Sequence, residues 1–154
     1  SKWYGNFPPS TRPRIVRDVT SLVLGRPSKQ CAFVEYKDKK IVYKRYASLF
    51  FVAGIGGAES EEESNQRGAE NELITLEKIH LFVEILDRYF GNVCELDIIF
   101  NFHRAYYILD ELMIGGYLQE TSKKEVLKSC SAMDDMMDVQ EGKEGANRRK
   151  SGAR

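Results

Sequence analysis

The fold is decided by the segment QCAFVEYKDKKIVYKRYASLFFVA, which occupies residues 30–53. Runs of β-branched and aromatic residues alternate within it with polar residues. Branched and aromatic side chains fit the pleated surface of a sheet, whereas polar residues favour the turns between strands. The segment therefore predicts an antiparallel meander with strands at Gln30–Tyr36, Ile41–Tyr46 and Leu49–Ala53.

An amphipathic helix is predicted ahead of this meander. Ser10 has the residue type of an N-cap, Pro13 falls where the first helical turn tolerates proline, and Gly25 is placed to end the helix. Residues Ser1–Tyr4 are expected to form the end of a strand. The apolar residues at helical spacing are Ile15, Val16, Val19, Leu22 and Val23.

Helices dominate the chain after residue 70. Apolar residues at helical spacing predict a long helix over residues 71–90 and a second helical region over residues 95–114. Ser122, followed three positions later by Glu125, forms a capping-box signature for a last helix that reaches about Met137.

The order of these elements predicts an α+β domain with an antiparallel sheet flanked by helices. At 154 residues the chain suits a single domain, which we assign to residues 1–137. Residues 138–154 contain almost nothing apolar and are predicted to be a disordered tail. Residues 56–70 are rich in Gly, Ser and Glu, which predicts a solvated insertion.

The charges are unevenly distributed along the chain, and its cysteines are few. Residues 1–58 carry eleven Lys and Arg against three acids, whereas residues 59–77 carry seven Glu against one Arg. Such asymmetry indicates either a charged partner or ordinary solvated charge. The cysteines are too few and too widely spaced for a disulfide framework or a metal site, so we expect reduced thiols, with Cys31 and Cys94 in the core.

The motifs that usually carry catalysis are missing from the sequence. Gly54–Gly57 follows a strand but lacks the Lys-Ser/Thr of a phosphate loop, and the acidic run after it would repel phosphate. His80 and His103 are too few for a zinc site, which needs three or four ligands. We therefore expect no enzyme activity, no metal and no cofactor, although a small enzyme with an unrecognised site stays open.

Nucleic-acid binding is also disfavoured. Lysines, Arg45 and three tyrosines cluster around one hairpin, as a platform for single strands would require. Alternation along the strand, however, puts Tyr43 and Arg45 on one face and Lys44 and Tyr46 on the other. The cluster is thus divided between core and solvent, and no nucleic-acid partner is expected.

The chain resembles the small (sigma) chains of clathrin adaptor complexes over nearly all of residues 1–133. The similarity begins at KIVYKRYASL (40–49) and continues in family order, and NELITLE (71–77) and QETSKK (119–124) look most like the trans-Golgi and endosomal type. Further segments that carry the resemblance are Phe82–Glu84, Tyr89–Phe90, Val93–Asp97, Phe100–Phe102 and Tyr106–Glu111.

The resemblance implies a longin-like fold, from whose sheet the first, central strand is missing in this sequence. It implies assembly with two large adaptin subunits and one medium subunit, indirect contact with clathrin, and binding of cargo-tail peptides. The implied setting is cytoplasmic and peripheral on trans-Golgi, endosome and clathrin-coated vesicle membranes. A longin domain of a SNARE or of another coat subunit is the alternative, and the lack of heptads in residues 138–154 disfavours a SNARE.

The resemblance also implies a site for acidic dileucine sorting signals. It places Val83 in the slot for the leucines rather than in the core between helix and sheet. In the family, an arginine that pairs with the signal's acid lies just before the segment that matches Lys2, Trp3 and Tyr4. That position is absent from this sequence, so the basic partner is expected from missing residues or from the large subunit. The residues that the family assigns to the site correspond to Ala47, Leu49, Val83, Asn92, Val93 and Ile98.

Overall fold

A computed structural model describes residues 1–27, 30–37, 39–56 and 72–151, with side chains as far as Met137. The chain divides into two compact units, Ser1–Val83 and Glu84–Arg154. We refer to them as the first and the second unit and describe each by itself.

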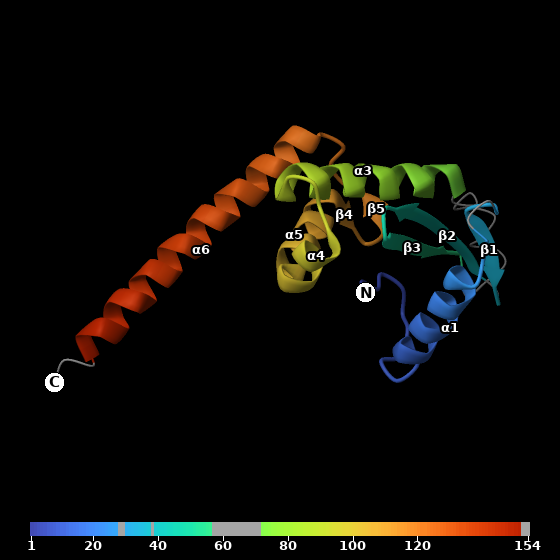
Figure 1. Cartoon of the computed structure of the whole chain (residues 1–154), viewed down its shortest axis with the longest axis horizontal. Coiled ribbons are helices and arrows are strands. Elements are labelled where there is room, and N and C mark those ends of the chain that lie inside the picture. Colours follow the sequence, from blue (N-terminus) through green and yellow to red (C-terminus); the bar gives the residue numbers. More distant parts are fainter. Residues whose placement is uncertain (28–29, 38, 57–71, 152–154) are drawn as a thin grey trace. The chain divides into compact units, whose positions relative to one another are not determined.

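The first unit holds a three-stranded antiparallel sheet in the order β1-β2-β3 (Figure 1). The strands are β1 (Phe33–Tyr36), β2 (Lys39–Tyr46) and β3 (Leu49–Ile55). The predicted meander is therefore confirmed, with β1 three residues shorter at its start, and β2 and β3 each two residues longer, than expected. Among the described residues, no strand pairs with the outer edge of β3.

Both faces of this sheet are covered by helices. On one face, Val42 and Ile55 pack with Ile79 and Val83 of helix α3 (Glu72–Phe90). Helix α1 (Arg12–Leu24) covers the other face. Strand alternation thus sorts the apolar residues into two layers.

Helix α1 (Arg12–Leu24) lies on the opposite face of the sheet from α3 (Figure 1). Its Val23 packs with Ile41 and Tyr43 of β2. Tyr43 and Tyr46 therefore do lie on different faces, as the alternation predicted.

The N-terminus of the chain differs from the prediction. Thr11, rather than Ser10, occupies the N-cap of α1, and its hydroxyl donates to the Pro8 carbonyl at 2.8 Å. Residues 1–10 form no strand, because no described strand pairs with them; the Trp3 ring instead packs against Phe7 at 5.1 Å.

The second unit is mainly helical and contains the end of α3. It continues with α4 (Glu95–Phe100) and α5 (Phe102–Leu112), the short hairpin β4 (Met113–Ile114) and β5 (Tyr117–Leu118), and α6 (Lys123–Ser151). Helix α5 packs against α6, and Ile108, Leu112 and Val126 are almost completely buried.

The predicted helical region 95–114 is two helices and the start of a hairpin. Asn101, with φ −120° and ψ 37°, leaves helical geometry and separates α4 from α5. Gly115 and Gly116 have positive φ, which lets the chain reverse between β4 and β5 where the sequence predicted only a helix end.

The last helix departs from its prediction in two ways. Only half of the capping box forms: the Glu125 N–H donates to Ser122 Oγ at 3.4 Å, but the Ser122 N–H donates to Glu120. The backbone of α6 also continues to Ser151, well beyond Met137.

Two further predictions are not tested by the structure. The division of the chain at residue 137 stays a prediction. The insertion predicted for residues 56–70 lies, apart from Gly56, outside the described residues.

The cysteine prediction was partly wrong. Cys31, Cys94 and Cys130 are all free thiols, but Cys31 and Cys94 are exposed and Cys130 is the buried one. Cys94 lies at the N-cap of α4. Its burial was expected from the apolar character of cysteine, which says nothing of the position of the residue at a helix end.

Candidate peptide-binding site

The residues predicted to bind a dileucine signal fall into two sets. Ala47, Leu49 and Val83 lie in the first unit, and Asn92, Val93 and Ile98 lie in the second. Each set is described within its own unit.

Ala47 lies in the two-residue turn that joins β2 to β3, where Tyr46 pairs with Leu49. Its φ of 51° is in the left-handed region, which costs an alanine free energy that a glycine would not lose. The Arg45 side chain stabilises the turn by donating from Nε to the Ala47 carbonyl at 2.7 Å. Ala47 is exposed and Leu49 is half-buried, so the turn presents a small apolar surface to solvent.

Val83 does not occupy an open position. Its side chain is 6% exposed and belongs to the core cluster with Val42 and Ile79. The expectation that Val83 lies outside the core between helix and sheet is therefore wrong, because the residue faces the sheet from α3.

The second set lies on one short piece of chain, Gly91–Ile98, which we call the 91–98 segment. Gly91 and Asn92 both have positive φ, 67° and 68°, so the chain turns sharply at the end of α3. The N–H groups of both residues donate to the Asp87 carbonyl, at 2.9 and 3.1 Å. Asn92 is exposed, and Val93 and Ile98 are half-buried.

Carboxylates hold the next part of this segment. The Val93 N–H donates to Asp87 Oδ1 at 3.1 Å, and the Cys94 N–H donates to Asp97 Oδ2 at 2.9 Å. The structure thus joins Asn92, Val93 and Ile98 into one backbone-fixed element. The Gly91-Asn92 pair is a partial signal for this turn, since glycine followed by asparagine is typical of a left-handed helix end.

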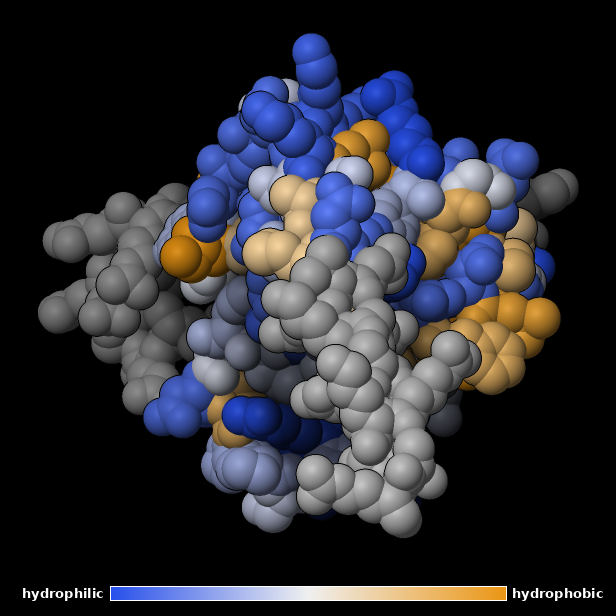
Figure 2. Space-filling view, turned by 90° about the vertical axis from the view of Figure 1, so that its left-hand side faces the viewer, coloured by the Kyte–Doolittle hydropathy of each residue, from blue (hydrophilic) through white to orange (hydrophobic). Residues whose placement is uncertain are grey.

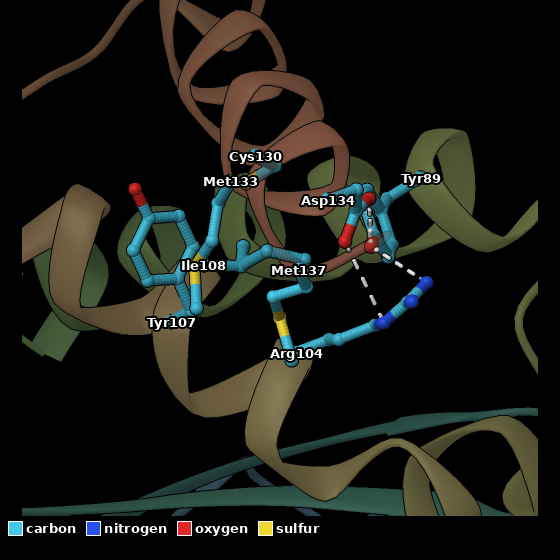
Figure 3. Close-up of a pocket in the computed structure, with 8 residues that line it drawn as sticks. All are labelled: Tyr89, Arg104, Tyr107, Ile108, Cys130, Met133, Asp134 and Met137. Atoms are coloured by element: carbon cyan, nitrogen blue, oxygen red, sulfur yellow. Dashed lines mark hydrogen bonds and ion pairs between the residues drawn. The ribbon is translucent and has the colours of Figure 1, made fainter. Parts of the chain in front are cut away.

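A polar network in the second unit was not predicted. Tyr89 of α3 donates to Asp134 Oδ2 of α6 at 2.5 Å and accepts from Arg104 Nη1 of α5 at 3.1 Å (Figure 3). Arg104 Nε lies 3.6 Å from Asp134 Oδ1. No local sequence signal identifies these partners, because they are 15 and 45 residues away from Tyr89.

This network lines a small hollow together with apolar side chains (Figure 3). Burial, and then the hydrogen bond to Asp134, raise the pKa of Tyr89 to about 12. Burial raises the pKa of Cys130 to about 11. Both groups are thus held in their neutral forms, which suits a structural contact among three helices. The remaining lining residues are Tyr107, Ile108, Met133 and Met137.

Several large apolar side chains of the second unit are exposed, and Figure 2 shows one face on which hydrophobic side chains interrupt a mainly hydrophilic surface. The elements that carry these residues contact one another, and exposed apolar side chains that gather in this way are typical of a contact with another protein. The exposed apolar residues on α4, α5 and the β4–β5 hairpin are Leu96, Ile99, Phe100, Phe102, Ile114 and Tyr117.

Within the described ranges, no three His, Cys, Asp or Glu side chains come together as a metal site would require. In the same ranges, no helix is long and apolar enough to cross a membrane.

The chain matches the model of one known protein family. The model of the clathrin adaptor complex small chain matches residues 1–137. This chain belongs to that family. The resemblance inferred from the sequence, and the mixed helix and antiparallel sheet expected from it, are confirmed.

Similar proteins bear names of one adaptor type. The AP-1 complex subunit sigma-2 of Dictyostelium discoideum is 54% identical over 138 residues, which cover 90% of this chain and 82% of the relative. The AP-1 complex subunit sigma-1 of Schizosaccharomyces pombe is 55% identical over 134 residues, 87% of this chain and 76% of the relative. The AP-1 complex subunit sigma-1A of Homo sapiens is 50% identical over 140 residues, 91% of this chain and 82% of the relative.

A similar fold occurs in a chain of the homology model of the full-length AP-3 complex in a stretched open conformation. The two chains superpose with a TM-score of 0.65 at 28% identity, and the match covers 92% of this chain and 89% of the other. These relatives are named as subunits of adaptor complexes and not as enzymes.

Proposed function

We propose that the chain is the small subunit of an AP-1-type clathrin adaptor complex and that it helps to recognise acidic dileucine signals in cargo tails. It would assemble with two large subunits and one medium subunit, and would reach clathrin through them. The complex would act on the cytoplasmic side of trans-Golgi, endosomal and coated-vesicle membranes. The names of the AP-1 relatives support the complex type.

The observation that carries the cargo proposal is the 91–98 segment. It presents Val93 and Ile98 half-buried, so each keeps apolar surface that a ligand can cover. It also presents the exposed amide side chain of Asn92, which can donate to and accept from a peptide backbone. An apolar surface beside one polar group, on a fixed backbone, suits an apolar side chain in an extended peptide.

The expected strength of binding agrees with reversible cargo capture. Burial of a leucine side chain stabilises a complex by ~1.5–3 kcal/mol, and the ordering of a flexible tail offsets part of this. Ala47, Leu49 and Val83 belong to the first unit, and their part in cargo binding stays a separate prediction.

The exposed apolar residues of α4 and α5 are the proposed contact with a large subunit. Leu96 is 59% exposed and Phe100 is 73% exposed, which is unfavourable for a free monomer in water. We therefore expect the chain expressed alone to aggregate and the chain expressed with its large partner to stay soluble. A soluble, cooperatively unfolding monomer would contradict this assignment.

The test of the cargo proposal is Val93→Asp in the assembled complex. The carboxylate stays hydrated when the site is empty, but a bound leucine would remove its water, so affinity for a dileucine peptide should fall about a hundredfold. Fluorescence polarisation with the dileucine peptide measures this, and a peptide with two alanines gives the background.

Met136→Asp is the matched control, because it places the same charge at an exposed apolar position of α6. Both variants should assemble as the wild type does. Unchanged peptide affinity in Val93→Asp would exclude the 91–98 segment from the cargo site. Identification of the co-purified subunits separates an AP-1-type complex from another trafficking complex with a longin domain.

A further inference from the structure

We propose that Asp87 is a positioning residue of the cargo site, an inference that rests on the proposed function. Its backbone carbonyl and its carboxylate together hold the backbone of residues 91–93, so that Asn92 and Val93 are presented to a cargo peptide in one conformation.

The geometry for this role is complete within the last turn of α3 and the residues after it. The Asp87 carbonyl accepts from the N–H groups of Gly91 and Asn92, at 2.9 and 3.1 Å. Asp87 Oδ1 accepts from the Val93 N–H at 3.1 Å. One residue therefore satisfies three consecutive backbone donors.

The hydrogen bonds to Asp87 matter for the backbone of residues 91–93 because most of this turn is exposed. Asn92 has a φ of 68°, a conformation that is unfavourable for a residue with a Cβ, although asparagine tolerates it better than most residues do. Gly91, Asn92 and Cys94 are all exposed, and of residues 91–94 only Val93 is half-buried. The hydrogen bond from Val93 restrains the residue that follows the left-handed pair.

Asp97 completes the arrangement from the other side. Its Oδ2 accepts from the Cys94 N–H at 2.9 Å. With the donors of residues 91–94 occupied, the main chain of this turn has only carbonyl oxygens left for a ligand. A cargo peptide would therefore approach with its own N–H groups toward the turn, and the exposed Asn92 side chain would supply the remaining donor.

The chemistry of the Asp87 side chain allows a sharp test. An asparagine has a carbonyl Oδ1 that can also accept from the Val93 N–H, but it carries no charge. Asp87→Asn should therefore preserve the turn, and Asp87→Ala should lose the side-chain bond while the carbonyl bonds remain. Asp87 is exposed, so neither change leaves a cavity in the core.

The experiment compares the two Asp87 variants and the wild type in the assembled complex. Asp135→Ala, which removes an exposed carboxylate from α6, is the matched control. We expect Asp87→Ala to weaken dileucine-peptide binding about three- to tenfold, the loss of one hydrogen bond, and Asp87→Asn to stay within about twofold of the wild type. Hydrogen exchange of the backbone over residues 91–94 should accelerate in Asp87→Ala alone.

Each result has a distinct meaning. Peptide affinity unchanged in Asp87→Ala, while the wild type still discriminates between leucine and alanine peptides, would overturn the role of Asp87 and leave the proposed function intact. Equal losses in Asp87→Asn and Asp87→Ala would also overturn it, because the charge and not the hydrogen bond would then matter. A wild-type complex that does not discriminate between the peptides would overturn the proposed function and this inference with it.

Discussion

The turn at Ala47 and the 91–98 segment both carry predicted cargo-binding residues, but different forces shape them. The turn at Ala47 joins two strands whose ladder fixes its ends, and the layers on the sheet hold the ladder in place. The 91–98 segment has no strand partner among the described residues and is held by the carboxylates of Asp87 and Asp97. Substitutions near the first region should therefore act through folding, whereas substitutions near the second should act through local conformation.

The largest expected effect shows whether Val83 of α3 is a core residue or a cargo-site residue. Val83→Asp would bury a charge between α3 and the sheet, and should destabilise the subunit by more than about 3 kcal/mol. The yield of assembled complex measures this loss. Leu73→Asp is the control on the same helix, since Leu73 is 61% exposed. Normal assembly of Val83→Asp together with lost peptide binding would show instead that Val83 lines an open slot.

The next effect is a difference in the reaction rates of the three cysteine thiols. Cys130 is buried and its pKa is raised to about 11, so at pH 8 it should react with a maleimide at least about a hundredfold more slowly than exposed Cys31 and Cys94. A bound dileucine peptide should slow Cys94, which follows Val93, and leave Cys31 unchanged. Mass spectrometry of each labelled site measures the rates, and equal protection of Cys31 and Cys94 would contradict the proposed location.

A smaller effect should appear at alkaline pH in the second unit. The unfolded chain releases the Tyr89 proton near its ordinary pKa of 10, whereas the folded chain holds it until about pH 12. The stabilisation is therefore complete below pH 10 and is lost as the pH rises toward 12. The melting temperature of the Tyr89→Phe complex should fall less steeply over this range than that of the wild type. Tyr117→Phe, at an exposed position, should follow the wild type.

The smallest effect tests the strain in the hairpin turn. Ala47→Gly should stabilise the sheet by about 1 kcal/mol, because glycine adopts the positive φ without steric cost. Slower hydrogen exchange in β2 and β3 of the assembled complex would show it. Lys37→Gly is the control, since Lys37 has a φ of 57° and lies outside the proposed site. If the Ala47 methyl group contacts cargo, only Ala47→Gly should also weaken peptide binding slightly.

Prediction from the sequence worked best where one local pattern decides the structure. The alternation in residues 30–53 gave the strands and the helical spacing in residues 71–90 gave α3, because local periodicity and burial agree there. Prediction failed where distant or competing hydrogen-bond partners decide the local structure. The Ser122 N–H binds Glu120 instead of Glu125, and Asn101 divides a helical region whose apolar pattern is continuous.

The candidate site, too, was predictable from the sequence only in part. Sequence similarity selected Asn92, Val93 and Ile98, but neither periodicity nor composition could show that the Asp87 carboxylate accepts from the Val93 N–H. A side chain six positions away reaches that donor only because Gly91 and Asn92 turn the chain back toward α3. The exposure of Cys94 was likewise invisible to residue type. The wrong position of Val83 came from the family resemblance, since its helical spacing agrees with burial.

By itself, the sequence determined the class of fold, the order of the elements and the family, since these depend on patterns spread over most of the chain. Only the tertiary structure decided which apolar residues fill the core, which remain open for a ligand, and which polar groups join α3, α5 and α6 through Tyr89, Arg104 and Asp134. The physical reason is that burial and hydrogen bonding depend on the position of every neighbour in space, whereas propensity depends mainly on the neighbours in sequence.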